Sequence, residues 1–478
     1  MSRIEADVAI IGGGSGGYSA AIRARELGRS VVLIEKDRVG GTCLHRGCIP
    51  TKAMLHAAEV ADTVRGAAAI GIQAELASID AATIASYRDR IVQTKFTGLQ
   101  GLLAKRGVQI ISGTARLSGA GLVSVDDGDS VTAACPEPVA CPEPVEGPVE
   151  VAAQDIVLAT GATSRTLPGL EVSDRILTSD EALALDRVPA SAIILGGGVI
   201  GVEFASLWRS LDAEVTIIEA LDHLAPAEDV DLSKALERAY RRRGIRSSLG
   251  VRFASAEQSA DGVTVTLEDG TTHTAEVLLV AVGRAPATDG LGLEEAGVAT
   301  DRGFVVVDEQ LRTSAEHVWA VGDIVPGLQL AHRGFAHGIA VAERISGLTV
   351  PALIEAQVPR VTYSHPELAS VGLTEAQAIE AHGADAVTTI QYNLAGNARS
   401  EILGTGGLVK VVRQKDGPVV GVHVIGDRVG ELITEGQLAV AWDAHPEDIA
   451  GLIHAHPTQS EALGEAFLAL AGKPLHVL

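Results

Sequence analysis

Residues 7–22 read DVAIIGGGSGGYSAAI, an apolar run followed by a glycine-rich turn and the start of a helical pattern. The apolar run is typical of a short buried strand, and the glycines follow the GxGxxG spacing of a dinucleotide-binding turn. Gly12 permits the tight turn, Gly14 lets the backbone approach a pyrophosphate, and Gly17 lets the helix pack on the strand. The N-terminus of the helix offers unbonded N–H groups to the phosphates, so we expect a dinucleotide here.

A second predicted strand, residues 30–34, ends at Glu35, which lies 23 positions beyond the first glycine of the turn. In dinucleotide-binding units a carboxylate at about this distance accepts a hydrogen bond from a ribose hydroxyl. Glu35 is therefore the expected ribose ligand.

The same pattern returns in the middle of the chain. A predicted strand at 192–195 leads into Gly196, Gly198 and Gly201, and a later strand ends at Glu219, again 23 positions beyond the first glycine. One GxGxxG is weak evidence because ordinary turns are also glycine-rich. Two copies with the same strands, helix and acid leave little room for that alternative, and the sequence predicts two bound dinucleotides.

Glu219 also indicates which nicotinamide cofactor is used. Its carboxylate would accept a hydrogen bond from a free 2′-hydroxyl and would repel a 2′-phosphate. The following residues, ALDHL at 220–224, include no arginine that could neutralise such a phosphate. The sequence favours NAD over NADP.

Length and charge limit the other functions open to the chain. At 478 residues it should form three or four domains of roughly 150 residues each. A net charge of −23 argues against nucleic acid or an anionic membrane as a partner. No apolar run reaches the roughly 20 residues of a membrane span, and the N-terminus lacks the pattern of a secretory signal. We expect a cytoplasmic protein, in which thiols are kept reduced.

The segment GGTCLHRGCIPTK, residues 40–52, places Cys43 and Cys48 five positions apart. In a reduced compartment such a pair suggests a metal site or redox chemistry, and no further ligands at short spacing complete a zinc site. Five residues of regular α-helix rise about 7.5 Å, which exceeds the roughly 7 Å limit for a disulfide. A bond therefore requires a distorted helix, and we expect Pro50 to cause the distortion before a helix over 51–59. Two buried reduced cysteines are the alternative.

The segment 40–52 resembles the redox-active disulfide region of the flavoprotein disulfide oxidoreductases, and the resemblance covers essentially the whole chain. Other motifs that occur in the family's order are VLATGA at 157–162 with Thr160 and Gly161, VGRAP at 282–286 with Gly283, VWAVGD at 318–323 with Gly322 and Asp323, and YSHPELASVGLTE at 363–375.

The resemblance implies an α/β protein with two Rossmann-like domains, for FAD and NAD, and a C-terminal α+β dimerisation domain. The expected boundaries are 1–160 for the FAD domain, 161–282 for the NAD domain, 283–352 for a segment that completes the FAD domain, and 353–478 for the interface domain. By the same resemblance the protein is a homodimer.

The resemblance also implies roles around the flavin. Asp323 would contact the ribityl chain, Cys48 would lie against the flavin, and Cys43 would meet the substrate. Lys52 occupies the position of a lysine near flavin N5, with an exposed helical lysine as the alternative.

The segment HAHPTQSE, residues 454–461, supplies the expected base. By resemblance His456 is that base and Glu461 is the carboxylate that orients it. Histidine titrates in the right range to take a thiol proton. As an alternative, Thr458 and Glu461 match a capping box at a helix start, which Pro457 would suit. His454 is left open between packing and function.

Two features depart from the family pattern. His45 and Arg46 lie between the cysteines, where the family more often has a small polar and an apolar residue. A basic neighbour would stabilise a thiolate and favour the reduced form. The tandem repeat ACPEPV-ACPEPV lies in an expected exposed insertion, 134–148, because its prolines exclude regular helix and central strand. Its cysteines, Cys135 and Cys141, are expected to have no redox role.

Within the family, the resemblance is greatest to members that oxidise protein-bound dihydrolipoamide with NAD as the final acceptor. It implies a lipoyl-bearing acyltransferase component of a 2-oxo acid dehydrogenase complex as partner, and a base contributed by the second subunit. The alternative is an NAD(P)H-dependent reductase of a low-molecular-weight disulfide of the glutathione or mycothiol kind. A flavin-bearing docking component without activity would have lost the cysteines or His456, and both are present.

Overall fold

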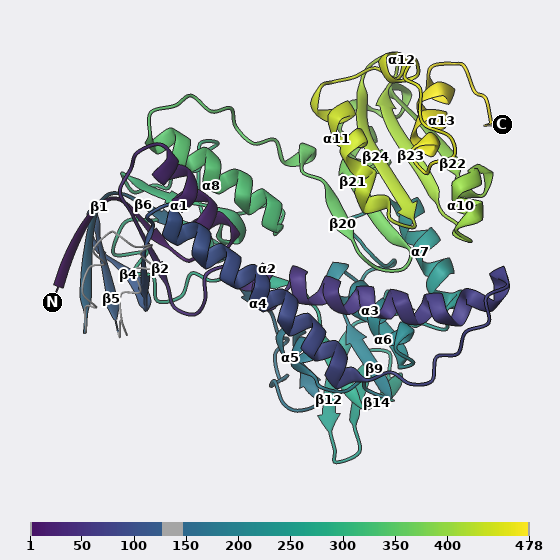
Figure 1. Cartoon of the computed structure of the whole chain (residues 1–478), viewed down its shortest axis with the longest axis horizontal. Coiled ribbons are helices and arrows are strands. Elements are labelled where there is room, and N and C mark those ends of the chain that lie inside the picture. The colour runs from purple at the N-terminus through teal and green to yellow at the C-terminus, as the bar shows by residue number, and fades with distance from the viewer. Residues whose placement is uncertain (1, 127–146, 477–478) are drawn as a thin grey trace. The chain divides into compact units, whose positions relative to one another are not determined.

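The computed structural model describes residues 2–126 and 147–476, and it divides the chain into two compact units (Figure 1). The first unit combines residues 1–53, 85–165 and 284–355, and the second combines 54–84, 166–283 and 356–478. Each unit is therefore assembled from segments that are distant in the sequence.

The first unit is built on a seven-stranded sheet in the order β3-β2-β1-β6-β5-β4, with β19 paired to the end of β6. Strands β3, β2, β1, β6 and β19 run parallel, whereas β5 pairs antiparallel with β6, and β4 pairs antiparallel with β5. The strands are β1 (Ser2–Ile11), β2 (Val31–Glu35), β3 (Gln109–Ser112), β4 (Thr114–Gly119), β5 (Leu122–Asp126), β6 (Val149–Leu158) and β19 (Val318–Ala320).

Helices cover the parallel part of this sheet, and α1 and α8 lie side by side (Figure 1). The longer helices that contribute to the first unit are α1 (Ser15–Glu26), α2 (Gly41–His45), α3 (Cys48–Gly66), α4 (Ala81–Lys105) and α8 (Ala331–Ile345). Short elements complete it, namely β7 (Ala162–Ser164), β16 (Arg284–Pro286), β17 (Thr300–Asp301), β18 (Phe304–Val305) and the 3₁₀ turn η2 (Gly322–Ile324).

The second unit contains a second parallel sheet, in the order β11-β10-β9-β15-β8. Its apolar strands are buried on both faces, as parallel strands usually are. The elements are β8 (Ile176–Leu177), α5 (Ser179–Ala184), β9 (Ser191–Leu195), α6 (Val199–Ser210), β10 (Glu214–Glu219), α7 (Val230–Arg242), β11 (Arg246–Leu249), β15 (Val277–Val280) and the antiparallel β12 (Phe253–Gln258), β13 (Val263–Leu267) and β14 (Thr272–Ala275).

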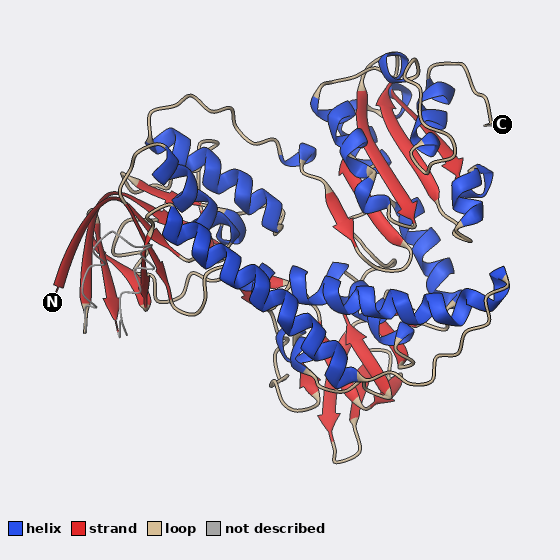
Figure 2. Cartoon of the chain, in the orientation of Figure 1, coloured by secondary structure: helices blue, strands red, loops and turns tan. Residues whose placement is uncertain are grey.

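Residues beyond 356 form a five-stranded antiparallel sheet, β20-β21-β24-β23-β22, flanked by helices (Figure 2). Its strands and helices are β20 (Arg360–Thr362), β21 (Glu367–Gly372), α9 (Glu375–His382), β22 (Val387–Asn393), α10 (Ala398–Ile402), β23 (Leu408–Gln414), β24 (Val419–Gly426), α11 (Ile433–Ala441), α12 (Pro446–Ile449) and α13 (Glu461–Leu470). The remaining 3₁₀ turns of the chain are η1 (Ala67–Ile70), η3 (Glu355–Gln357), η4 (Ala384–Ala386), η5 (Leu394–Gly396) and η6 (Val429–Glu431).

The predicted strands are present, and some are longer than the sequence pattern indicated. The strand expected at 7–11 begins at Ser2 because its first half pairs in register with Val149–Ala153 of β6. The repeat predicted as an insertion at 134–148, with Cys135 and Cys141, lies almost entirely outside the described residues, which resume at 147. Within the described ranges, no helix has the length and apolar character needed to cross a membrane.

Candidate active site

The first glycine turn has the geometry of a phosphate cradle. Gly12 follows β1 with φ +103°, and a Cβ there would lie 2.4 Å from the carbonyl oxygen of Ala159. A Cβ on Gly17 would lie 1.8 Å from the carbonyl oxygen of Gly12, so α1 can pack this closely only with glycine. Beside Gly14 the nearest atom to such a Cβ is 4.0 Å away, which leaves the backbone open to a ligand. This turn fits the pyrophosphate of a dinucleotide.

The second glycine turn repeats this geometry between β9 and α6. Gly196 has φ +105°, and a Cβ there would lie 2.3 Å from the carbonyl oxygen of Ala281. A Cβ on Gly201 would lie 1.9 Å from the carbonyl oxygen of Gly196, whereas one on Gly198 would meet nothing within 4 Å. The second turn therefore fits a second dinucleotide in the same way.

Glu35 and Glu219 are each hydrogen-bonded to a glycine turn. Glu35 accepts hydrogen bonds from the backbone N–H groups of Gly13 (2.6 Å) and Asp37 (2.9 Å). The sequence pattern predicted a ribose acceptor but not this second role, in which the carboxylate ties the end of one strand to the glycine turn after another.

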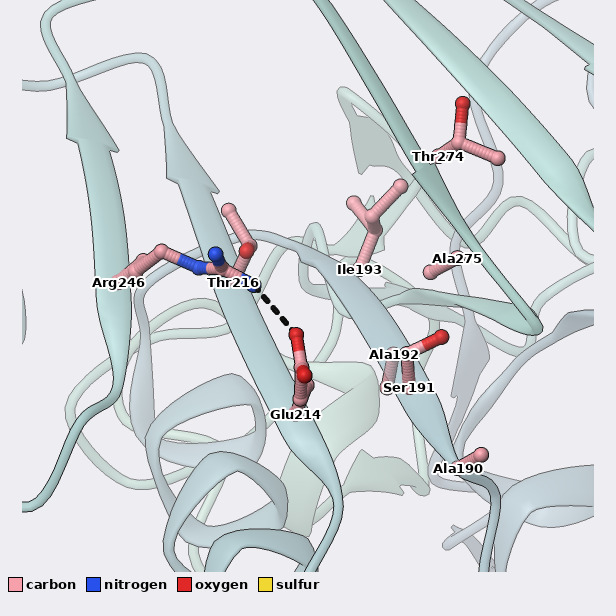
Figure 3. A pocket seen from close by; sticks show the side chains of 9 residues that line it. All are labelled: Ala190, Ser191, Ala192, Ile193, Glu214, Thr216, Arg246, Thr274 and Ala275. Carbon is pink, nitrogen blue, oxygen red and sulfur yellow. Dashed lines mark hydrogen bonds and ion pairs between the residues drawn. The ribbon is translucent and has the colours of Figure 1, made fainter.

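A pocket in the second unit is separate from the second glycine turn (Figure 3). It opens beside Ser191 and Glu214, at the N-terminal ends of β9 and β10, and a 2.9 Å ion pair joins Glu214 to Arg246 at its wall. The glycine turn and Glu219 lie at the C-terminal ends of the same strands, where parallel sheets bind ligands. The pocket is not the nicotinamide site. Its lining residues are Ala190, Ser191, Ala192, Ile193, Glu214, Thr216, Arg246, Thr274 and Ala275.

The two cysteines lie on either side of a break between helices. Cys43 is in α2, Cys48 begins α3, and Arg46 between them has non-helical angles of φ −141° and ψ 22°. The predicted interruption is confirmed, but Pro50 does not cause it. Pro50 occupies the first turn of α3, where its missing N–H costs no helical bond, and the predicted helix starts at Cys48 rather than at residue 51. A Cβ on Gly47 would lie 2.9 Å from the carbonyl oxygen of Thr42, so the tight turn needs glycine.

Both cysteine side chains are thiols in the structure, and they contact each other. A hydrogen bond with the Cys48 side chain, together with burial, raises the pKa of the Cys43 thiol, and the ammonium group of Lys52 opposes this rise. Burial and the nearby Cys43 raise the pKa of Tyr18 in α1 to about 12. The pair therefore lies close to the helix that starts at the first glycine turn.

A direct hydrogen bond joins the cysteine segment to that turn. The N–H of Gly40 donates to the carbonyl oxygen of Gly13 at 2.7 Å, and a Cβ on Gly41 would lie 2.7 Å from the Cα of Gly14. Sequence reasoning did not identify this contact, although the paired glycines before the first cysteine are a signal for close backbone approach. The redox pair and the first cradle are thus parts of one site.

The two basic residues between the cysteines have other partners. The Nε2 atom of His45 lies 2.9 Å from the carbonyl oxygen of Val39, and its ring meets Phe96 edge-on at 5.1 Å. Arg46 forms a 2.8 Å ion pair with Asp37. The cation that opposes the raised pKa of Cys43 is Lys52. The effect of His45 and Arg46 on the stability of the reduced form stays a prediction.

The predicted flavin-binding motif VWAVGD, residues 318–323, ends in a buried turn of the first unit. Asp323 lies in η2 after β19, and burial raises the pKa of its carboxyl group although Arg284 and Arg333 oppose the shift. Thr160 donates through its hydroxyl to the carbonyl oxygen of Ala287 at 2.7 Å. Two further motif glycines have positive φ, +72° at Gly161 and +107° at Gly283.

His456 and Glu461 form a pair in the second unit. The imidazole Nδ1 and the carboxylate Oε1 are 2.8 Å apart, and 74% of the His456 side chain is exposed. Oε2 of Glu461 accepts from the N–H of Thr458 at 2.7 Å. Burial alone would raise the pKa of Glu461, but this amide and His456 hold it below its usual value. The arrangement leaves Nε2 of His456 available for proton transfer.

The capping-box alternative is realised only in part. Glu461 does bond a backbone amide, but the hydroxyl of Thr458 bonds the carbonyl oxygen of Ala455, and α13 begins at Glu461 after Ser460. His454 is packed: its Nε2 lies 2.8 Å from Glu435, and a Cβ on Gly464 would lie 2.5 Å from its Nδ1.

The predicted catalytic residues therefore form two groups. Cys43, Cys48 and Lys52 belong to the first unit with the first glycine turn, and His456 and Glu461 belong to the second unit. The structure brings the members of each group together.

Known proteins resemble this chain over nearly its whole length. A model described as pyridine nucleotide-disulphide oxidoreductase matches residues 6–338, and a model of that family's dimerisation domain matches residues 358–467. Dihydrolipoyl dehydrogenase of Bacillus subtilis is 38% identical, with 99% of both chains covered, and dihydrolipoyl dehydrogenase 3 of Pseudomonas aeruginosa is 38% identical, with 98% of both covered. The crystal structure of LpdA from Mycobacterium tuberculosis superposes with a TM-score of 0.87 at 29% identity, covering 98% of this chain and 100% of that one.

These matches confirm the resemblance stated from the sequence, the α/β fold with its C-terminal dimerisation domain, and the use of FAD and NAD by the family. The chain belongs to the pyridine nucleotide-disulphide oxidoreductase family.

Proposed function

We propose that the chain is an NAD-dependent dihydrolipoyl dehydrogenase that oxidises protein-bound dihydrolipoamide. The observation that carries the proposal is the contact between Cys43 and Cys48 in a segment bonded directly to the first glycine turn. Full-length relatives with the name dihydrolipoyl dehydrogenase favour this function over reduction of a low-molecular-weight disulfide. The partner would be the lipoyl-bearing acyltransferase component of a 2-oxo acid dehydrogenase complex.

The working molecule is proposed to be a homodimer with domains at the boundaries expected from the sequence. The matched dimerisation domain supports this, and so does an apolar surface next to the proposed base. Ile453 is 100% exposed, Leu452 is 64% exposed and Trp442 is 75% exposed. Leu452 and Ile453 are sequence neighbours shortly before His456, and exposed apolar side chains are typical of a surface that a second protein covers.

Oxidation of the substrate would begin with the Cys43–Cys48 disulfide formed. The partner subunit's His456 removes the proton of one dihydrolipoamide thiol at Nε2, while the partner subunit's Glu461 holds Nδ1 and stabilises the imidazolium. The substrate thiolate attacks the sulfur of Cys43, so a mixed disulfide forms, the bond to Cys48 breaks, and Cys48 leaves as a thiolate.

The second substrate thiol completes the exchange. It attacks the substrate sulfur of the mixed disulfide, the bond to Cys43 breaks, and its proton passes to Cys43. Closed lipoamide leaves, and two electrons have moved from the substrate to the cysteine pair. Lys52, which lowers the pKa of Cys43, assists the departure of that sulfur.

When bound, FAD would accept these two electrons from the cysteine dithiol, which would restore the disulfide, and NAD would accept them from the flavin as hydride. Residues of this chain would hold the two groups. The first glycine turn, Glu35, Lys52 and Asp323 would bind FAD, and the second glycine turn with Glu219 would bind NAD.

The test is formation of NADH by the purified flavoprotein given dihydrolipoamide and NAD. We expect rapid turnover that Cys43→Ser abolishes while flavin stays bound. Absence of NADH formation, combined with NADPH-driven reduction of a glutathione- or mycothiol-like disulfide, would establish the reductase function instead. Retained turnover in Cys43→Ser would overturn the assignment of the cysteine pair.

A further inference from the structure

Helix α8 lies against α1, which carries the first glycine turn, and the two backbones approach closely (Figure 1). A Cβ on Gly338 would lie 2.2 Å from both the carbonyl oxygen of Gly16 and the hydroxyl of Ser19. A Cβ on Gly334 would lie 2.7 Å from the hydroxyl of Ser15. The position of α8 is therefore set directly by the first turns of α1.

Two side chains of α8 also form hydrogen bonds to Gly322, in the predicted flavin-binding motif at residues 318–323. The N–H of Gly322 donates to Nδ1 of His337, and the carbonyl oxygen of Gly322 accepts from Nη1 of Arg333, both at 3.3 Å. These side chains are almost fully buried, with 2% of His337 and 3% of Arg333 exposed. The backbone N–H and the carbonyl oxygen of Gly322, the residue before Asp323, are thus both hydrogen-bonded to α8.

Arg333 is itself fixed by further partners. Its Nε donates to Glu355 at 2.5 Å and its Nη2 donates to the carbonyl oxygen of Pro326 at 2.5 Å. A buried guanidinium held by a carboxylate and two carbonyl oxygens cannot shift without leaving polar groups unbonded.

His337 can act as an acceptor only while its ring is neutral. Burial, reinforced by the positive charges of Arg333 and Arg344, lowers the pKa of His337 to about 3. The lone pair on Nδ1 therefore remains available to the N–H of Gly322 at every pH at which the enzyme would work.

We propose that Arg333 and His337 are positioning residues of the flavin site, which hold Asp323 in register with the glycine turn at the start of α1. The inference rests on FAD binding as assigned above, and it adds two residues that are not expected to touch the cofactor. Without their bonds to Gly322, Asp323 is no longer tied to the helix that packs on the first cradle.

The test compares three variants by their affinity for FAD and by the visible absorption and circular dichroism of bound flavin. His337→Asn keeps an acceptor oxygen near the position of Nδ1, whereas His337→Leu fills a similar volume with no acceptor. Val341→Ala, on the same helix at a fully buried position, controls for loss of stability without loss of a polar bond.

We expect His337→Leu to weaken FAD binding by about 10-fold or more and to alter the flavin spectrum, because a buried N–H loses its partner. His337→Asn should bind FAD within a few-fold of the wild type. The inference is overturned if His337→Leu binds FAD normally, or if both His337 variants lose FAD only as far as their stability predicts from Val341→Ala. A wild-type chain that binds no FAD would instead contradict the proposed function itself.

Discussion

Glu35 and Glu219 occupy equivalent positions in the two compact units of the chain. Oε2 of Glu219 accepts from the N–H of Gly197 at 2.5 Å and its Oε1 accepts from the N–H of Leu221 at 2.8 Å, as Glu35 does with Gly13 and Asp37. Each carboxylate thus joins its glycine turn to the neighbouring strand, and each is proposed to bind a different cofactor.

This equivalence predicts that matched substitutions separate the two cofactors. Glu219→Gln should raise the KM for NAD by about 10-fold or more, because one charged acceptor is lost, and should leave the FAD content unchanged. Glu35→Gln should weaken FAD and leave NAD binding to the loaded enzyme unchanged. Steady-state kinetics and flavin content measure the two effects. Loss of both cofactors in either variant would contradict the assignment.

The pair of His456 and Glu461 predicts a selective loss of thiol chemistry. His456→Gln should lower kcat/KM for dihydrolipoamide by about 10²- to 10⁴-fold, because no group then takes the substrate proton. Reduction of bound flavin by NADH should be unaffected, since it requires no thiol deprotonation. Both are followed by absorbance.

A matched control for this prediction lies two residues away. His454 and Glu435 form a pair of the same type at the same 2.8 Å distance, and the mechanism does not use them. Glu435→Gln should keep kcat/KM within a few-fold, whereas Glu461→Ala should lower it by about 10-fold or more. Equal losses in the two variants would indicate that Glu461 has only a structural role.

The charge of Lys52 is predicted to increase the reactivity of Cys43 in the reduced cysteine pair. Because its ammonium group lowers the pKa of Cys43, Lys52→Met should reduce the thiolate fraction and slow alkylation of Cys43 by iodoacetamide at fixed pH. Lys52→Arg should restore the rate, and Lys36→Met should not change it. Peptide mass analysis identifies the modified cysteine. An unchanged rate in Lys52→Met would exclude this electrostatic role.

The lowered pKa of the buried His337 predicts that the unfolding free energy of the protein depends on pH. The pKa of this side chain is lowered from 6.5 to about 3 in the folded protein, so the unfolded chain takes up a proton first as the pH falls. The stabilisation is complete above about pH 6.5 and is lost between there and pH 3, at up to about 1.4 kcal/mol per pH unit. Burial is the largest cause of the lowered pKa, and the positive charges of Arg333 and Arg344 add to it.

Urea unfolding at a series of pH values from 4 to 7 measures this effect. His337→Asn should flatten the dependence of the unfolding free energy on pH, because Asn does not titrate. Val341→Ala on the same helix removes no titratable group and should leave the slope as in the wild type. A wild-type slope in His337→Asn would contradict the assignment.

Features that depend on local geometry could be predicted from the sequence. The strand, turn and helix around Gly12 and Gly196 follow from short-range sterics, and the offset to the acids follows from the length of one strand–helix–strand unit. The break near the cysteines was predicted for the wrong reason, because the crowding between Gly47 and Thr42 is not visible as a residue preference.

Contacts between distant segments could not be predicted in this way. Arg333 and His337 fit an ordinary helical pattern, and their bonds to Gly322 exist only because α8 folds back over the turn before it. Likewise, nothing in the pattern of the first helix predicts that Tyr18 lies close to Cys43. Periodicity describes which face of a helix is buried but not which peptide it meets.

The division of the first unit has a consequence for biosynthesis. The chain leaves this unit after Arg165 and returns at Arg284, so β19 and α8 are translated only after the whole second glycine-turn domain. Translation proceeds at roughly 5–20 residues per second. The edge of β6 that β19 later covers therefore stays unpaired for about 10–30 s while the chain between them is synthesised. We expect nascent chains to need chaperone protection during this interval, and flavin to enter only after residue 345 has emerged.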